Sequence, residues 1–201
     1  IPNVRFFRPG DPNEAAAAWG VAVERRHAPT VLAFTRQKLP VLAGSITGAA
    51  AGVRRGAYVL REATGGSPKM ILISTGSELH LAVAAAEQLE AAGTPTRVVS
   101  MPCPELFGEQ DAAYRESVLP AAIRARVAIE AGVSFGWDRW SGTDGAIIAM
   151  DRFGASAPAP TLFKEFGFTP ERIVEIAKGV LAGTVHGVVP TPHLHDGHQV
   201  R

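Results

Sequence analysis

Short apolar runs alternate with helical patterns along most of the chain after residue 56. Between the runs, apolar residues recur three or four positions apart, and Leu79, Val83, Ala86 and Leu89 are the clearest case. Strands that alternate with helices indicate a parallel sheet. We therefore predict an α/β fold over residues 57–183, with a mostly parallel five-stranded sheet flanked by helices. The predicted strands are residues 56–60, 70–74, 96–101, 126–130 and 146–150.

The first of these strands is predicted to be the antiparallel exception. A Gly-Gly-Ser-Pro turn at residues 65–68 separates it from the second strand. A connection this short cannot make a parallel crossover. Further helices are predicted over residues 105–118 and from Thr169 onward.

A separate strand–helix–strand pattern precedes this sheet. Asp11 suits the N-cap of the helix, Pro12 suits its first position, and Glu14 is expected to complete a capping box by reaching back to the Asp11 amide. The second strand, residues 30–35, is continuously apolar and is therefore expected to be buried. This partial βαβ unit has few strands of its own, so we expect another polypeptide segment or subunit to cover residues 1–42.

Two stretches lack a regular pattern. Residues 43–56 consist largely of Gly, Ala and Ser and are interpreted as a linker between domains. Residues 184–201 turn to Gly, Pro and His and are interpreted as a flexible tail. Its histidines could chelate a divalent metal, but without a surrounding core the flexible tail is the favoured interpretation. These histidines are His186, His193, His195 and His198, around Asp196.

Composition excludes several classes of protein. The 201 residues carry 20 Lys+Arg and 19 Asp+Glu, a net charge of +1, which argues against a polybasic protein that binds nucleic acid or a membrane surface. No apolar run approaches the ~20 residues that span a bilayer. Cys103 is the single cysteine, which excludes a disulfide framework and favours a reducing, cytoplasmic location.

Arg36 is the strongest candidate for a binding residue. It follows the predicted strand 30–35, and ligands of parallel sheets collect at the carboxyl ends of the strands. A guanidinium there can hold a phosphate with two parallel hydrogen bonds. The alternative is an ordinary surface or ion-paired arginine.

Three other features have structural interpretations that we favour. The Thr75-Gly76-Ser77 turn could bind an anion at a helix N-terminus, but it lacks the spacing of a phosphate-binding loop. Cys103 lies between two prolines with no basic cluster beside it, and is read as structural. Trp137, Arg139 and Trp140 could stack on a base or sugar, although packing is commoner.

Several long motifs occur in order and resemble the transketolase family. They cover about residues 1–182, and the strings at residues 110–120 and 153–169 distinguish transketolases from 2-oxoacid dehydrogenase β-subunits and deoxyxylulose-phosphate synthases, which share this C-terminal fold. The matching strings are Arg8-Pro9, Ala28-Pro29-Thr30, Thr35-Arg36-Gln37, Ser100-Met101-Pro102, Glu105-Leu106-Phe107, QDAAYRESVLP at 110–120, AIEAG at 128–132, FGASAP at 153–158 and LFKEFGFT at 162–169.

The resemblance implies the end of a pyrimidine-binding domain (residues 1–42) and a transketolase C-terminal domain (residues 57–183). Transketolases transfer a two-carbon ketol group between sugar phosphates in the pentose phosphate pathway. They use thiamine diphosphate with a divalent cation, Mg or Ca, and act as cytoplasmic homodimers. The resemblance assigns one site residue: Arg36 matches the arginine that holds the phosphate of the sugar substrate.

The family's other site residues do not map onto this chain. The nearest string to its metal motif, Gly142-Thr143-Asp144-Gly145, is not followed by Asn. The activating glutamate, the pyrimidine pocket and the substrate-binding histidines belong to a preceding part of the protein. We therefore expect no catalytic, cofactor-binding or metal-binding residue here, and an inactive isolated chain. A non-catalytic assembly or regulatory ligand-binding module remains the alternative function.

Overall fold

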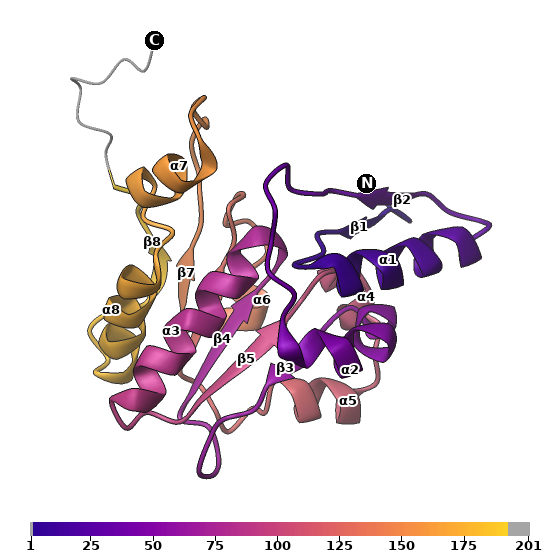
Figure 1. The fold of residues 1–201 in the computed structure, drawn as a ribbon. Coiled ribbons are helices and arrows are strands. Elements are labelled where there is room, and N and C mark those ends of the chain that lie inside the picture. Colours follow the sequence, from indigo (N-terminus) through magenta and orange to yellow (C-terminus); the bar gives the residue numbers. More distant parts are fainter. Residues whose placement is uncertain (1, 193–201) are drawn as a thin grey trace.

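The computed structural model describes residues 2–192 and contains two sheets of unequal size (Figure 1). The smaller one pairs β1 (Arg5–Phe7) with β2 (Thr30–Leu32) in parallel, and helix α1 (Pro12–Glu24) connects them. The larger one has six strands and lies beside it. We call residues 2–42 the first unit and residues 57–189 the C-terminal unit.

The C-terminal unit confirms the predicted α/β class with its mostly parallel sheet. The strand order is β3-β5-β4-β6-β7-β8, and only the β3–β5 pair is antiparallel. The antiparallel first strand is thus confirmed, but β5 rather than β4 lies next to it. The strands are β3 (Tyr58–Arg61), β4 (Met70–Ser74), β5 (Thr96–Ser100), β6 (Arg126–Ile129), β7 (Ala146–Ile148) and β8 (Gly187–Val189).

The sheet has six strands, not five, because β8 comes from the stretch predicted as a flexible tail. Gly187 donates its backbone N–H to the carbonyl of Gly145, and Val188 and Val189 pair with Ile147 and Ile148. The prediction of a loose tail from residue 184 is therefore wrong for Gly187–Val189. The strand β8 forms because it pairs with the edge of β7, a tertiary contact that the sequence pattern does not show. The histidines at 193, 195 and 198 lie outside the described residues.

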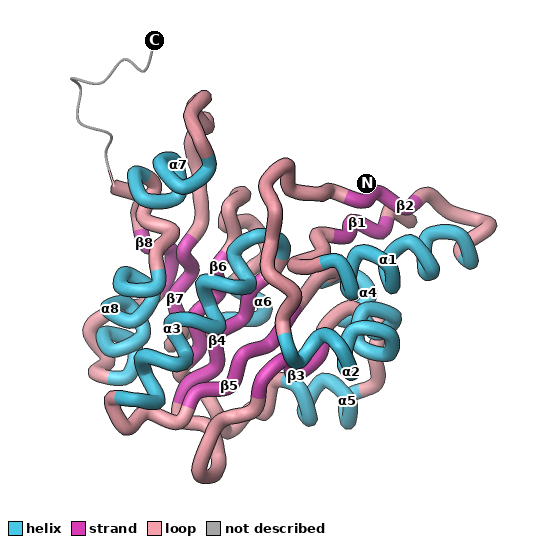
Figure 2. The backbone as a smooth tube through the Cα atoms, viewed as in Figure 1, coloured by secondary structure: helices cyan, strands magenta, loops and turns pink. Residues whose placement is uncertain are grey.

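Helices cover both faces of this sheet (Figure 2). Helices α3 (Leu79–Ala91) and α8 (Pro170–Leu181) pack on one face over Met70 and Leu72. The alternate residues, Ile71 and Ile73, point to the opposite face. That face is covered by α4 (Pro104–Gly108), α5 (Ala112–Val118) and α6 (Asp138–Ser141). The short helices η2 (Gly76–Glu78) and α7 (Ala159–Glu165) complete the unit.

The helix predicted over residues 105–118 is divided into α4 and α5. Asp111 begins the second helix as its N-cap, because its carboxylate accepts the Tyr114 N–H at 2.7 Å. A side chain that accepts a backbone N–H replaces the helical hydrogen bond of that N–H, so it begins a new helix at Asp111 and does not continue the previous one.

Residues 43–56 form α2 (Ala43–Gly52) and the 3₁₀ helix η1 (Val53–Arg55), not an irregular linker. Three glycines four residues apart, Gly44, Gly48 and Gly52, lie on the helix face that meets β3. A Cβ at Gly44 would lie 1.8 Å from the Leu60 carbonyl oxygen, and one at Gly52 would lie 2.2 Å from Tyr58. The small residues that hid the helical pattern are therefore what allows this helix to pack.

Candidate functional site

The carboxyl ends of β1 and β2 open onto a cavity of about 390 Å³. The two strands are parallel, so the turns that follow them lie on the same side of the small sheet. The start of α1 forms the opposite wall. The lining residues are Pro9, Asp11, Pro12, Ala15, Phe34, Thr35, Gln37, Lys38 and Leu39.

Asp11 holds the two sides of this cavity together. As predicted, it is the N-cap of α1, with Oδ1 2.9 Å from the Glu14 N–H. Its Oδ2 accepts the Leu42 N–H at 3.0 Å and the Ser45 hydroxyl. Because the side chain is buried, these bonds anchor the end of the segment 33–42 to the beginning of α1.

The predicted capping box is wrong in one of its two hydrogen bonds, the one from the Asp11 amide to Glu14. The carboxylate of Glu14 accepts the Gly10 N–H at 2.7 Å, not the Asp11 amide. Its other oxygen accepts the hydroxyl groups of Tyr58 at 2.8 Å and Ser100 at 2.5 Å. Burial raises the pKa of Glu14, against the opposing effect of these hydrogen bonds. Glu14 therefore connects the two units and does not serve only its own helix.

Arg36 lies on the segment that borders the cavity, between the lining residues Thr35 and Gln37. Its side chain is exposed, and it forms no hydrogen bond or ion pair with residues 2–192. The alternative of an ion-paired arginine thus finds no partner within the described part of the chain.

The strand before Arg36 is shorter and more exposed than predicted. β2 ends at Leu32, and Val31 and Phe34 are 42% and 50% exposed. Among the described residues β2 has one neighbouring strand, β1, so one of its edges stays open. A continuously apolar strand is buried only where neighbouring strands and helices cover it.

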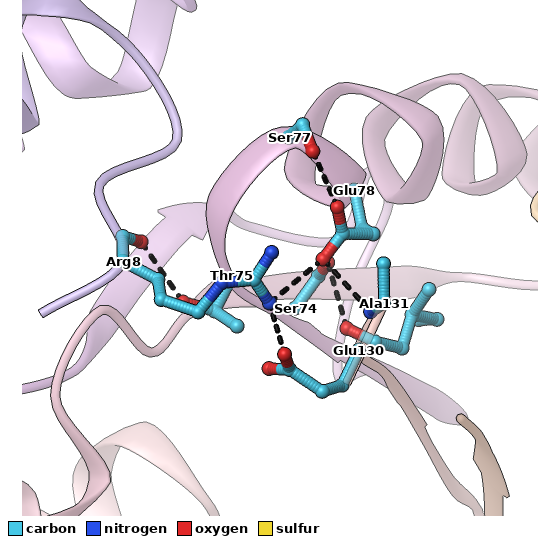
Figure 3. A network of polar contacts seen from close by, with 8 residues as sticks. Arg8, Ser74, Thr75, Ser77, Glu78, Glu130 and Ala131 are labelled. Carbon is cyan, nitrogen blue, oxygen red and sulfur yellow. Dashed lines mark hydrogen bonds and ion pairs between the residues drawn. The ribbon is translucent and has the colours of Figure 1, made fainter. Parts of the chain in front are cut away.

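A second concentration of polar groups lies at the carboxyl edge of the large sheet (Figure 3). The Arg8 guanidinium contacts the carboxylates of Glu78 and Glu130, which follow β4 and β6. Burial raises the pKa of Glu130 to about 7, with Arg8 opposing this shift and Glu78 adding to it. The Thr75–Ser77 turn faces these carboxylates and the Arg8 backbone, so its surroundings do not favour an anion.

Sequence reasoning assigned no binding role to Arg8, Glu14, Glu78 or Glu130. Each pairs with a residue far away in the chain, and no short motif unites them. The one available signal was the position of Glu130 directly after three apolar strand residues, 127–129, where a carboxylate requires a partner.

The other candidates have structural roles. Burial raises the pKa of the Cys103 thiol to about 12, which suits an inert side chain. Trp137 and Trp140 are buried, and Trp140 packs against Phe107 with ring centroids 5.1 Å apart. Asp144 is half-exposed and pairs with Arg124. Within residues 2–192 no three His, Cys, Asp or Glu side chains form a group that could hold a metal ion.

No helix in the described range 2–192 has the length and apolar character needed to cross a membrane.

Comparisons with known proteins agree with one another. Residues 56–169 match the family model described as the transketolase-like TK C-terminal domain. The chain is 54% identical over 182 residues to the chloroplastic transketolase of Solanum tuberosum, covering 90% of this chain and 24% of that protein. It is 51% identical over 181 residues to transketolase 1 of Vibrio cholerae, covering 90% and 27%.

A solved structure of transketolase from Leishmania mexicana superposes with a TM-score of 0.83 and 39% identity, over 96% of this chain and 27% of that one. The chain therefore spans about a quarter of the length of the curated relatives it matches.

Proposed function

Because the chain belongs to the transketolase family, we propose that it is the C-terminal part of a transferase that moves a two-carbon ketol group between sugar phosphates. In this proposal the complete enzyme acts in the pentose phosphate pathway, in the cytoplasm and as a homodimer. The exposed first unit is the surface on which the rest of the protein and its partner subunit would lie.

Arg36 carries the proposal for the site. Its guanidinium is free of intramolecular partners among residues 2–192 and lies on the segment bordering a cavity at the carboxyl ends of two parallel strands. We propose that it binds the terminal phosphate of the sugar with two parallel hydrogen bonds. Asp11 positions it indirectly, since Asp11 anchors the end of the same segment at Leu42.

Thiamine diphosphate and its Mg or Ca ion would be held elsewhere in the complete protein. The described residues offer no group of three metal ligands, so we derive no catalytic step from them. We accordingly propose that the 201-residue chain alone neither binds the cofactor nor transfers ketol groups. Calorimetric titration of this chain with thiamine diphosphate and magnesium should give no binding heat; micromolar binding would contradict this proposal.

The test of Arg36 uses the complete enzyme. Arg36→Ala should raise KM for phosphorylated sugars about 10- to 100-fold, the equivalent of the ~1.5–3 kcal/mol of a charged hydrogen bond. The kcat should fall less, because the phosphate contact is the same in the ground and transition states. Arg36→Lys should recover only part of the loss, since an ammonium cannot make the bidentate contact.

Two controls separate binding from folding. Arg26→Ala removes another exposed arginine, before the start of β2, and should leave KM unchanged. An unphosphorylated acceptor should be used equally well by the wild type and by Arg36→Ala. If the activity of Arg36→Ala with that acceptor falls as much as with the phosphorylated one, Arg36 is a structural residue. Absence of activity from the wild-type complete protein would instead favour the non-catalytic module.

A further inference from the structure

The large sheet has a point where its strand connections diverge. The chain passes from β4 to β5 on one side, and β6, β7 and β8 follow on the other. The loops after β4 and β6 therefore leave the sheet in opposite directions and open a crevice between them. In open parallel sheets, small-molecule ligands bind at such a point, outside the carboxyl ends of the strands.

The crevice in this protein is lined by acidic groups. The side chain of Glu78 is 0% exposed and that of Glu130 is 10% exposed. Glu78 also accepts the Ala131 N–H at 3.0 Å and the Ser77 hydroxyl. A cavity of about 520 Å³ adjoins Glu130, with Arg8, Thr75 and Trp137 also among its walls. Two buried carboxylates favour a cationic ligand with several hydrogen-bond donors.

Arg8 fills this role from outside the C-terminal unit. Its Nη1 lies 3.0 Å from Oε2 of Glu78 and also contacts Oε1 of Glu130, as Figure 3 shows. The backbone of Arg8 is bound at the same edge. Its N–H donates to the Pro102 carbonyl, and its carbonyl accepts from Thr75 Oγ1 and the Gly76 N–H, each at 2.9 Å.

Two glycines leave room for these charged groups. A Cβ at Gly76, whose φ is +57°, would lie 2.9 Å from Nη2 of Arg8. A Cβ at Gly132 would lie 2.6 Å from Oε1 of Glu130. A side chain at position 76 would thus take the space of the Arg8 guanidinium, and one at position 132 would take the space of the Glu130 carboxylate.

We propose that the crevice between β4 and β6 is a guanidinium-binding site whose ligand is Arg8 itself. A side chain of the first unit occupies the position where a sheet of this topology would hold a small molecule. Arg8 is consequently the positioning residue for the turn 8–11, which ends at the Asp11 anchor. This inference does not depend on the proposed transfer reaction, because it concerns only contacts within the chain.

The test is chemical rescue in the 201-residue chain. Arg8→Ala removes the part of the side chain beyond Cβ, and N-ethylguanidinium has the same atoms as that part. The reporter is the Gly76 amide, which donates to the Arg8 carbonyl, and its hydrogen exchange should become about 10- to 100-fold faster in the variant. Millimolar N-ethylguanidinium should restore the slow exchange in Arg8→Ala and leave the wild type unchanged. Ethylammonium should restore little, because it is too short to place its nitrogen where Nη1 of Arg8 contacts both carboxylates.

Two variants control this experiment. Arg54→Ala breaks the exposed Arg54–Glu24 pair and should respond to neither compound. Glu130→Gln combined with Arg8→Ala should abolish the rescue. Unchanged Gly76 exchange in Arg8→Ala, or equal protection of wild type and variant by N-ethylguanidinium, would overturn the proposal. Should Arg8→Ala fail to fold, the single variant Glu130→Gln tests the proposal. Faster exchange of its Gly76 amide than in the wild type supports the site, and unchanged exchange refutes it.

Discussion

The two sheets of this molecule are both built on parallel apolar strands, yet they differ sharply in burial. All five residues of β4 are buried, whereas Phe6 in β1 and Val31 in β2 are about two-fifths exposed. β4 has a strand on each side and helices on both faces, while β2 pairs with β1 on one side. The burial of a strand is therefore set by the number of its neighbouring strands and covering layers, and not by its own sequence.

The two units meet through polar groups as well as apolar ones. Phe7 and Ala18 join the core that α3 and α8 cover. Glu14 on α1, by contrast, reaches the hydroxyl groups of Tyr58 and Ser100 in the C-terminal unit. Buried hydrogen bonds require definite geometry, so they fix how the first unit is oriented.

Hydrogen exchange should show the largest contrast between the two sheets. The Ala33 amide donates to Phe7 across the small sheet, and the Ile71 amide donates to Ala125 within the large one. We expect Ala33 to exchange at least about 1,000-fold faster, because exposed edges open locally while central strands need global unfolding. Native-state exchange measured by NMR checks this.

The exchange of the same two amides should also be measured in the complete protein. There the Ala33 amide should slow by a large factor, and the Ile71 amide should hardly change. Similar exchange rates of Ala33 and Ile71 in the 201-residue chain would mean that the first unit is stable without a covering segment, contrary to our expectation.

Much of the fold could be predicted from hydrophobic periodicity, because strands and helices of the C-terminal unit bury continuous or one-sided apolar surfaces. Periodicity failed where small residues do the packing. The Gly44, Gly48 and Gly52 face of α2 carries no large apolar side chain. It failed again at β8, a three-residue edge strand whose partner is chosen by tertiary structure.

The sites were predictable to different degrees. Arg36 was identified from its position after an apolar strand and from the family resemblance, and its role stays a prediction. Arg8, Glu78 and Glu130 are brought together across 122 residues of sequence. A contact of that separation leaves no local pattern, because the fold and not the spacing creates it.

A matched pair of substitutions on α1 should separate the inner and outer faces of the first unit. Glu14→Ala leaves two buried hydroxyl groups without their acceptor and should lower the free energy of unfolding by about 2–4 kcal/mol. Glu24→Ala breaks an exposed pair with Arg54 and should have a much smaller effect, because solvent screens such a pair. Urea unfolding measures both. Equal effects would mean that Glu14 does not hold the units together.

A smaller effect than that of Glu14→Ala is expected from the pH dependence of Glu130, which lies at the junction of the two units. Burial raises the pKa of Glu130 from its ordinary value to about 7. Between about pH 4.5 and pH 7 the unfolded chain has released this proton while the folded chain retains it. The free energy of unfolding should therefore fall as pH rises through this window and level off above pH 7. Because the Glu130 side chain keeps some contact with solvent, we expect a fall of about 1–2 kcal/mol.

Comparison of wild type with Glu130→Gln isolates this group, because Glu14, whose pKa is also raised, acts in both proteins. The slope between pH 5 and pH 7.5 should be shallower in Glu130→Gln. Asp151→Asn provides the control, since the pKa of the exposed Asp151 is lowered by its bonds to Ser134, and its contribution falls at more acidic pH. Arg8 contacts Glu130, and Arg8, Phe6 and Glu130 line the same cavity. Equal slopes in Glu130→Gln and in the wild type would show that the pKa of Glu130 is not raised, and thus that the first unit does not cover it.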